Sequence, residues 1–156
     1  MAHFSLLPAV EISELADDVR QVFEELDAAL PAERRAHTGE CHPALDVFET
    51  DTAVEIVMDA SGIAAEALRV LFRAGVVLIA GEKAPPVARE PQTFHLVERE
   101  FGRFARAVRV NGAFDVHAAE AAVRDGELTV VLPKRPDRRG RTHRIEIRTD
   151  GSTQPA

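Results

Sequence analysis

The sequence predicts an all-β fold, an immunoglobulin-like antiparallel β-sandwich with an N-terminal helical arm and an extended C-terminal tail. Three observations lead to this prediction. Between residues 43 and 133, apolar and polar residues alternate in seven or eight short runs. Turn residues separate these runs about every 8–12 residues, and no long helical pattern interrupts them. We therefore divide the 156 residues into an arm (1–42), one sandwich domain (43–133) and a tail (134–156).

The arm is predicted to contain one amphipathic helix between Pro8 and Pro31. Its apolar residues recur at every third or fourth position and therefore share one face. This stripe consists of Ile12, Leu15, Val19, Val22, Leu26 and Ala29, with Phe23 beside it. Asp and Glu fill the opposite face. The stripe needs a partner surface, which is either the chain's own domain or another molecule.

A polar linker is predicted over residues 33–42, and strands follow it. In residues 53–59 (AVEIVMD) and 68–73 (LRVLFR) every second residue is apolar, the pattern of half-buried strands. The segment SGIAAEA between them allows a short helical turn. Residues 76–82 (VVLIAGE) are apolar nearly throughout, which predicts a strand with more continuous burial.

The second half of the domain begins with a predicted projecting loop, APPVAREPQ, whose three prolines exclude a central strand. Residues 94–100 (FHLVERE) and 103–110 (RFARAVRV) read as further strands. In AAVRDGELTVVLP, Asp125 and Gly126 separate two apolar runs, the strongest short hairpin signal in the sequence. Pro133 is predicted to end the last strand.

Arg106 falls in phase with Phe104 and Val108, on the face where its strand neighbours are apolar. An arginine on that face needs a carboxylate or an interface. The alternatives are an ion pair that spans a dimer, or a bulge that turns the side chain to solvent.

The sequence carries no clear pattern for catalysis. It lacks a glycine-rich phosphate loop and the G-x-S-x-G motif. One local cluster, His37, Cys41 and His42, has metal-ligating residue types, but three ligands on a polar linker make a poor site without a fourth. We therefore predict that the protein is not an enzyme and has no catalytic residue, cofactor or metal.

Cysteine usage and hydropathy bear on the compartment. The single Cys41 cannot form an intramolecular disulfide, which favours a reducing environment. The first residues lack the basic and apolar regions of a signal peptide, and no window approaches the roughly 18 apolar residues of a membrane span. The prediction is a cytoplasmic protein without a membrane span.

The net charge of −7 is unevenly distributed. Residues 1–42 hold nine acidic and three basic residues, whereas residues 133–156 hold three acidic and seven basic ones. A basic tail can bind nucleic acid, yet no aromatic residue is interleaved for base stacking and the whole chain is acidic. We prefer to interpret this region as a solvated linker, and expect no nucleic-acid partner.

Several motifs in order resemble one known family. FGRFARAVRV, AAVRDGELTVVLPK and then RIEI, together with PALDVFETDTAVEIVMD and GVVLIAGEK, resemble the α-crystallin domain and tail of small heat-shock proteins of the bacterial and plant-like branch. The resemblance covers about residues 42–148.

The resemblance implies a dimer and a larger homo-oligomer. Family members of this branch exchange the strand in the long loop, here Phe94, Leu96 and Val97, onto the partner's first domain strand. That strand here contains Leu45 and Val47, and Arg106 matches an interface arginine. The Ile145 and Ile147 pair matches the family tail motif, which docks on a neighbouring dimer. Here the docking groove would comprise Val70, Phe72 and Val123.

The function implied is an ATP-independent holdase chaperone, which binds partly unfolded client proteins during stress and prevents their aggregation. The arm stripe, from Ile12 to Leu26, would contact clients or other subunits. The alternative is an immunoglobulin-like co-chaperone or adaptor with one defined partner. Such adaptors lack the exchange loop and the tail motif, so these two features favour the holdase.

Overall fold

A computed structural model describes residues 9–34, 39–88 and 90–136. The chain begins with one long helix, continues through seven strands and includes two short 3₁₀ turns in that part. The elements are α1 (Ala9–Ala29), η1 (Ala32–Arg34), β1 (Leu45–Glu49), β2 (Ala53–Asp59), η2 (Ala65–Ala67), β3 (Leu68–Arg73), β4 (Val76–Lys83), β5 (Gly102–Arg109), β6 (Glu120–Arg124) and β7 (Glu127–Pro133).

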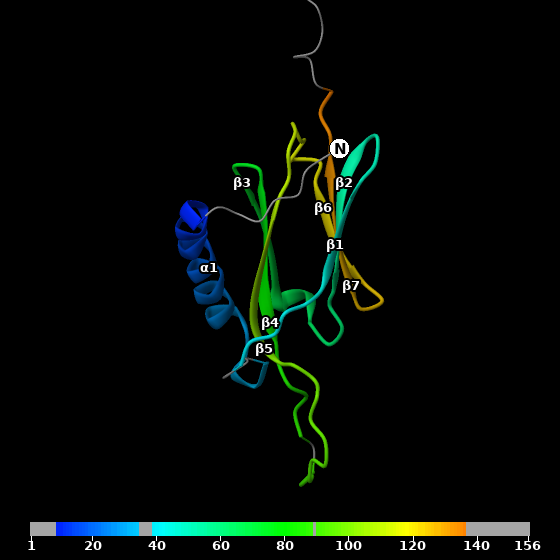
Figure 1. Ribbon diagram of the computed structural model, residues 1–156. Helices are drawn as coiled ribbons and strands as arrows, with labels where there is room; N and C mark the ends of the chain where they lie inside the picture. The colour runs from blue at the N-terminus through cyan, green and yellow to red at the C-terminus, as the bar shows by residue number, and fades with distance from the viewer. Residues whose placement is uncertain (1–8, 35–38, 89, 137–156) are drawn as a thin grey trace, which may run out of the picture.

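The strands form two antiparallel sheets that face each other, which confirms the predicted sandwich. One sheet has the order β1-β2-β7-β6, and the other has the order β3-β4-β5. Figure 1 shows the two sheets as separate layers, with α1 on the side of the β3-β4-β5 sheet that faces away from the other sheet. The molecule therefore has three layers along this direction: helix, small sheet and large sheet.

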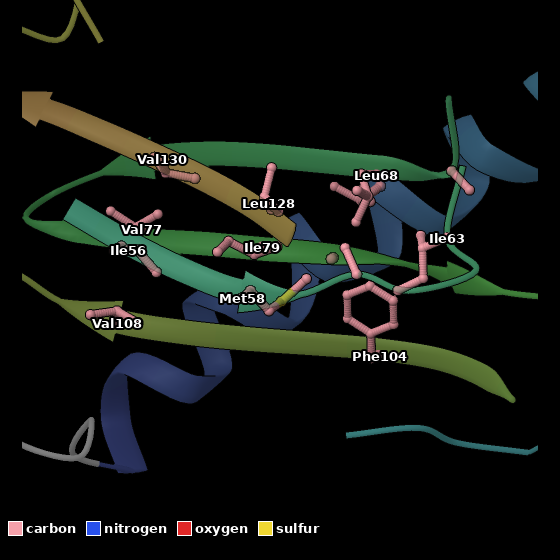
Figure 2. Close-up of a cluster of buried hydrophobic side chains, with 14 of the residues drawn as sticks. Ile56, Met58, Ile63, Leu68, Val77, Ile79, Phe104, Val108, Leu128 and Val130 are labelled. Carbon is pink, nitrogen blue, oxygen red and sulfur yellow. The ribbon is translucent and has the colours of Figure 1, made fainter. Parts of the chain in front are cut away.

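The main core lies between the two sheets (Figure 2). Val77 and Ile79 of β4 point towards Ile56 and Met58 of β2, and all four are essentially inaccessible to solvent. Phe104, Val108, Leu128 and Val130 extend the same cluster. Alternate residues of each strand supply this core, because side chains on an extended backbone alternate between its two faces.

The predicted turns are present. Asp125 and Gly126 both have positive φ angles, 52° and 81°, and join β6 to β7 in the predicted two-residue hairpin. The segment SGIAAEA contains η2, and β7 ends at Pro133. Helix α1 ends before Pro31, as expected.

Strand β4 is buried on both faces, as its continuous apolar sequence predicts. Seven of its eight residues are buried, from Val76 to Glu82. Because Val77 and Ile79 face the main core, Val76, Leu78 and Ala80 point to the opposite face of the sheet, where α1 lies. The helix therefore supplies the second half of the cover.

Helix α1 contacts this face through its C-terminal half. Val22 and Leu26 belong to the buried cluster, as does Leu30 just beyond the helix, and Leu26 has no exposed surface. Leu15, Val19 and Phe23 are half-buried. Val22, Phe23 and Leu26 of the predicted stripe therefore pack on the chain's own domain, whereas Ala29 is exposed and the side chain of Ile12 is outside the described set.

A buried ion pair lies under the helix. Glu82, at the end of β4, is 1% exposed, and the Arg103 side chain on β5 reaches its Oε1 with Nε at 2.8 Å. The same guanidinium pairs with Asp27 of α1 and stands 4.8 Å from the centroid of the Phe23 ring. Arg103 therefore joins the two strands and the helix at one point.

The linker is more structured near the domain than the sequence suggests. Gly39 and Cys41 exchange backbone hydrogen bonds with Arg103, both at 3.3 Å, and Glu40 forms a parallel bridge with the same residue. Gly102 has φ 137°, and a side chain there would collide with the backbone of Gly39. The polar linker predicted over residues 33–42 is therefore hydrogen-bonded to β5 at Gly39 and Cys41.

Residues 94–100 form no strand, contrary to the sequence-based expectation for FHLVERE. Along with residues 84–88 and 90–93, they lie in a segment that projects from the sandwich between β4 and β5 (Figure 1). The apolar alternation of a strand is present, but strand geometry also needs a neighbour for hydrogen bonding. In the described part of this single chain, no strand pairs with residues 94–100.

We expect Arg103→Met to lower the free energy of unfolding by about 3 kcal/mol, because it leaves the Glu82 carboxylate buried without its cation. This loss is at the lower end of what breaking a buried ion pair costs, because the Arg103 side chain is 35% exposed. Urea denaturation followed by circular dichroism measures the change.

The double variant Glu82→Met with Arg103→Met should recover most of that loss, because no charge remains buried. Arg124→Met, on the exposed strand β6, is the matched control and should change stability by less than about 0.5 kcal/mol. A single variant as stable as the control would contradict the structural role assigned to the pair.

Candidate functional site

The first candidate surface is the projecting segment between β4 and β5. Val87, Phe94, Leu96 and Val97 on it are among the most exposed large apolar side chains described, with Leu96 at 74%. Singly exposed apolar residues are common, but four on one segment without secondary structure are not. The segment has the residue pattern of a strand, but its apolar side chains are exposed as they would be at a binding surface.

Strand β1 offers a free edge. It pairs with β2 on one side, and within the described ranges no strand lies on its other side. Leu45 and Val47 are half-buried, whereas Phe48 is 44% exposed. An open edge of this kind presents unpaired backbone groups to which another strand can add.

Arg106 lies on the inner face of β5, in register with Ile79 and in phase with Phe104 and Val108. Its side chain is half-buried and donates a hydrogen bond to the backbone carbonyl of Pro43, just before β1. The strand is regular here, so the bulge alternative is wrong. The arginine therefore ties the residues just before β1 to β5.

Strands β3 and β6 are edge strands of the two sheets. The contact from Arg106 to Pro43 brings β5 close to β1 at one edge, which leaves β3 and β6 together at the other. We call this the β3–β6 edge.

The apolar side chains of the β3–β6 edge are incompletely covered. Val70 and Phe72 pair with Ile79 and Val77 of β4, and Val123 pairs with Leu128 of β7, so all three share the faces that build the core. Phe72 and Val123 nevertheless remain 36% exposed, and Val70 is half-buried. The structure thus brings the three residues predicted from the sequence to one open edge.

The remaining predicted residues are placed as follows. Ile145 and Ile147 lie outside the described residues. Ile12 belongs to α1, but its side chain is outside the described set. Val22 and Leu26 are buried against the domain, so in this arrangement they are not accessible to a client.

The chemistry around Cys41 is that of a structural thiol. Burial raises the pKa of this thiol above its usual value, and nearby Lys83 opposes the shift only in part. The Sγ–H donates to the carbonyl oxygen of Gly102 at 3.4 Å. Among the described residues no three His, Cys, Asp or Glu side chains gather as metal ligands would. No described helix is long and apolar enough to span a membrane.

Sequence reasoning missed Arg103, Glu82 and Asp27, which connect the helix to the small sheet. A signal for them was present, because Glu82 ends a run of apolar residues that predicts double-sided burial. A carboxylate in such a strand needs a cation nearby. Its partners could not be chosen among the many arginines without the strand register.

Comparisons with known proteins agree with this geometry. The model of the Hsp20/alpha crystallin family matches residues 46–148. The chain is 31% identical over 144 residues to the 18.9 kDa heat shock protein of Oryza sativa subsp. japonica, covering 88% of this chain and 81% of that protein. It is 30% identical over 112 residues to spore protein SP21 of Stigmatella aurantiaca, covering 72% of this chain and 65% of that protein.

A solved structure has the same fold. Heat shock protein 16.0 from Schizosaccharomyces pombe superimposes with a TM-score of 0.57 at 28% sequence identity, over 70% of this chain and all of that one. The match of the family model over residues 46–148, the 31% identity to the Oryza protein and the shared two-sheet fold lead to one conclusion: this chain belongs to the Hsp20/alpha crystallin family, the small heat-shock proteins.

Proposed function

We propose that this protein is an ATP-independent holdase chaperone that binds partly unfolded proteins and prevents their aggregation. The observation that carries the proposal is the concentration of exposed apolar side chains on segments that offer backbone for strand pairing, namely residues 84–88 and 90–101, β1 and the β3–β6 edge. Such surfaces bind extended chains by strand addition and side-chain pockets, without catalysis, cofactor or metal. We place this activity in the cytoplasm.

The assembly unit in this proposal is a dimer made by strand exchange. Residues 94–100 of one protomer would add to the free edge of β1 of its partner, so that the strand with Phe94, Leu96 and Val97 pairs with the strand that holds Leu45 and Val47. Two facts support this: the segment has a strand's sequence without a strand's partner, and β1 has an open edge. Within each protomer, Arg106 would hold the residues just before β1 in place through its hydrogen bond to Pro43.

Dimers would then be linked by the tail. Ile145 and Ile147 are two residues apart, so on an extended backbone their side chains point the same way. The β3–β6 edge presents exposed Phe72 and Val123 with Val70 between the sheets. We propose that this edge receives the isoleucine pair of a neighbouring dimer and so builds a larger homo-oligomer.

We expect the wild-type protein, without ATP, to suppress the light scattering of a heat-labile enzyme such as citrate synthase at near-stoichiometric ratio. Suppression follows from many weak apolar contacts, none of which needs an energy source. Serum albumin at equal mass is the control for non-specific protection. Scattering as high as that of the albumin control would refute the holdase function.

We expect Phe94→Asp with Leu96→Asp to convert the dimer into a monomer, because two carboxylates would be desolvated at the exchanged strand. Analytical ultracentrifugation measures the mass of the smallest species. Glu98→Asp, which keeps the charge in the same exposed segment, is the control. A dimer that survives the double substitution would contradict strand exchange through these residues.

We expect Ile145→Ala with Ile147→Ala to reduce the assembly towards a dimer, since the two truncations together remove most of the apolar area that the tail can bury at the edge. Light scattering after size-exclusion chromatography measures the mass. Glu146→Ala, between the two isoleucines, should leave the mass unchanged. A double variant of wild-type mass would exclude the tail as the link between dimers.

A further inference from the structure

The outer face of the β3-β4-β5 sheet has an apolar centre with arginines around it. Val76, Leu78 and Ala80 of β4 form the centre, and in register beside Leu78 lie Leu71 of β3 and Ala107 of β5. The same register places Arg69 and Arg73 on one flank and Arg103 and Arg109 on the other. We call this surface the arginine-framed face.

Helix α1 complements the arginine-framed face in shape and in charge. Asp18 pairs with Arg73 at 3.2 Å, and Glu25 lies 3.9 Å from Arg69. Asp27 pairs with Arg103 at the other flank. Between these acids Val22 and Leu26 enter the apolar centre. The helix therefore shows which chemistry the face accepts, apolar residues with carboxylates on both sides.

The cover is uneven along the helix. Leu26 and Leu30 are fully buried near its C-terminal end, where Asp27 and Arg103 meet. Further towards the N-terminus, Leu15 and Val19 are only half-buried, and a cavity of about 250 Å³ opens between α1 and β3. Its lining includes Asp18, Val22, Leu71 and Phe72. The Asp18–Arg73 pair is a surface ion pair with the Arg73 side chain 58% exposed, and pairs of this kind stabilise little, so this half of the helix is held weakly.

We propose that α1 is a removable cover and that the arginine-framed face beneath it is a binding surface for unfolded client segments whose apolar residues are flanked by Asp or Glu. This inference rests on the proposed holdase function and adds a surface and a preference to it. Release of the helix would uncover Val76 and Leu78 beside Leu71, which is already 40% exposed, and would separate Arg69, Arg73 and Arg103 from their carboxylate partners on α1. A client segment would replace α1 contact by contact.

The test introduces a reporter under the cover. In a Cys41→Ser background, Leu78→Cys places a thiol where only 3% of the native side chain is exposed. Labelling by a maleimide then measures how often α1 leaves. Asp18→Arg sets two positive charges against each other at Arg73, and we expect it to speed labelling by about three- to tenfold, the effect of losing a pair of about 1 kcal/mol or somewhat more.

Matched variants isolate the ion pair. Asp17→Arg changes the charge equally, but Asp17 is 78% exposed and, among the described residues, pairs with Arg20 of the same helix, so labelling should stay at the background rate. Adding Arg73→Asp to Asp18→Arg restores an attractive pair and should slow labelling again. Equal labelling rates for Asp17→Arg and Asp18→Arg would refute the proposal that α1 is a removable cover.

Client binding is read from the same thiol. Heat-unfolded citrate synthase should slow labelling of the Asp18→Arg variant, and so should a peptide of the α1 sequence, Glu14 to Leu30. The same peptide with every Asp and Glu replaced by Lys should not. Protection by neither the enzyme nor the α1 peptide would overturn the binding surface, even if the scattering assay shows holdase activity.

A second measurement needs no cysteine. Hydrogen exchange of the α1 backbone amides should accelerate in Asp18→Arg, and in the wild type when salt rises from about 0.1 to about 1 M, where the screening length falls from about 10 to about 3 Å. Exchange in β4 should stay slow, which separates release of the helix from global unfolding. Helix amides that do not respond in either case would contradict the proposal.

Discussion

The structure depends on one constraint: β4 must be covered on both faces. Its run of apolar residues from Val76 to Ala80 cannot face water on either side without a large loss of hydrophobic stabilisation. The large sheet covers one face and forms the main core. Helix α1 covers the other, so the arm is part of the folded domain's energetics in this chain. The position of α1 on the sheet, the burial of Val22 and Leu26, and the burial of Glu82 beneath the helix all follow from this requirement.

Much of this could be read from the sequence, because periodicity reports burial directly. The strands of the sandwich, the helix between two prolines and the Asp125-Gly126 hairpin all carry local signals, and the structure has them. Residues 76–82 also indicated burial on two sides. What covers the second side had no local signal, since an amphipathic helix is compatible with any apolar surface. The pairing of Arg103 with Glu82 likewise needed the strand register.

The expectation for residues 94–100 failed for a different reason. Alternation within the segment describes which side chains a strand would bury, but the hydrogen bonds that make it a strand come from a neighbour. In a single chain that neighbour is missing from the described part, and Phe94 and Leu96 stay exposed. Arg106 shows the reverse case. The sequence indicated that its side chain needs a partner, and the partner in this chain is a carbonyl of Pro43, which has no signature in the side-chain pattern.

The attachment of the linker to β5 has a kinetic consequence. Gly39 and Cys41 are bonded to the backbone of Arg103, so the chain is fixed to the domain a short distance after the helix ends. A helix that leaves the sheet stays tethered to the domain, and a short tether gives the helix an effective concentration in the millimolar range at the sheet. Recapture is then a first-order event whose rate does not depend on dilution. Unfolded protein has to bind the exposed face faster than the tethered helix rebinds it. Because the first rate rises with the concentration of unfolded protein and the second does not, the chain responds only above a threshold concentration.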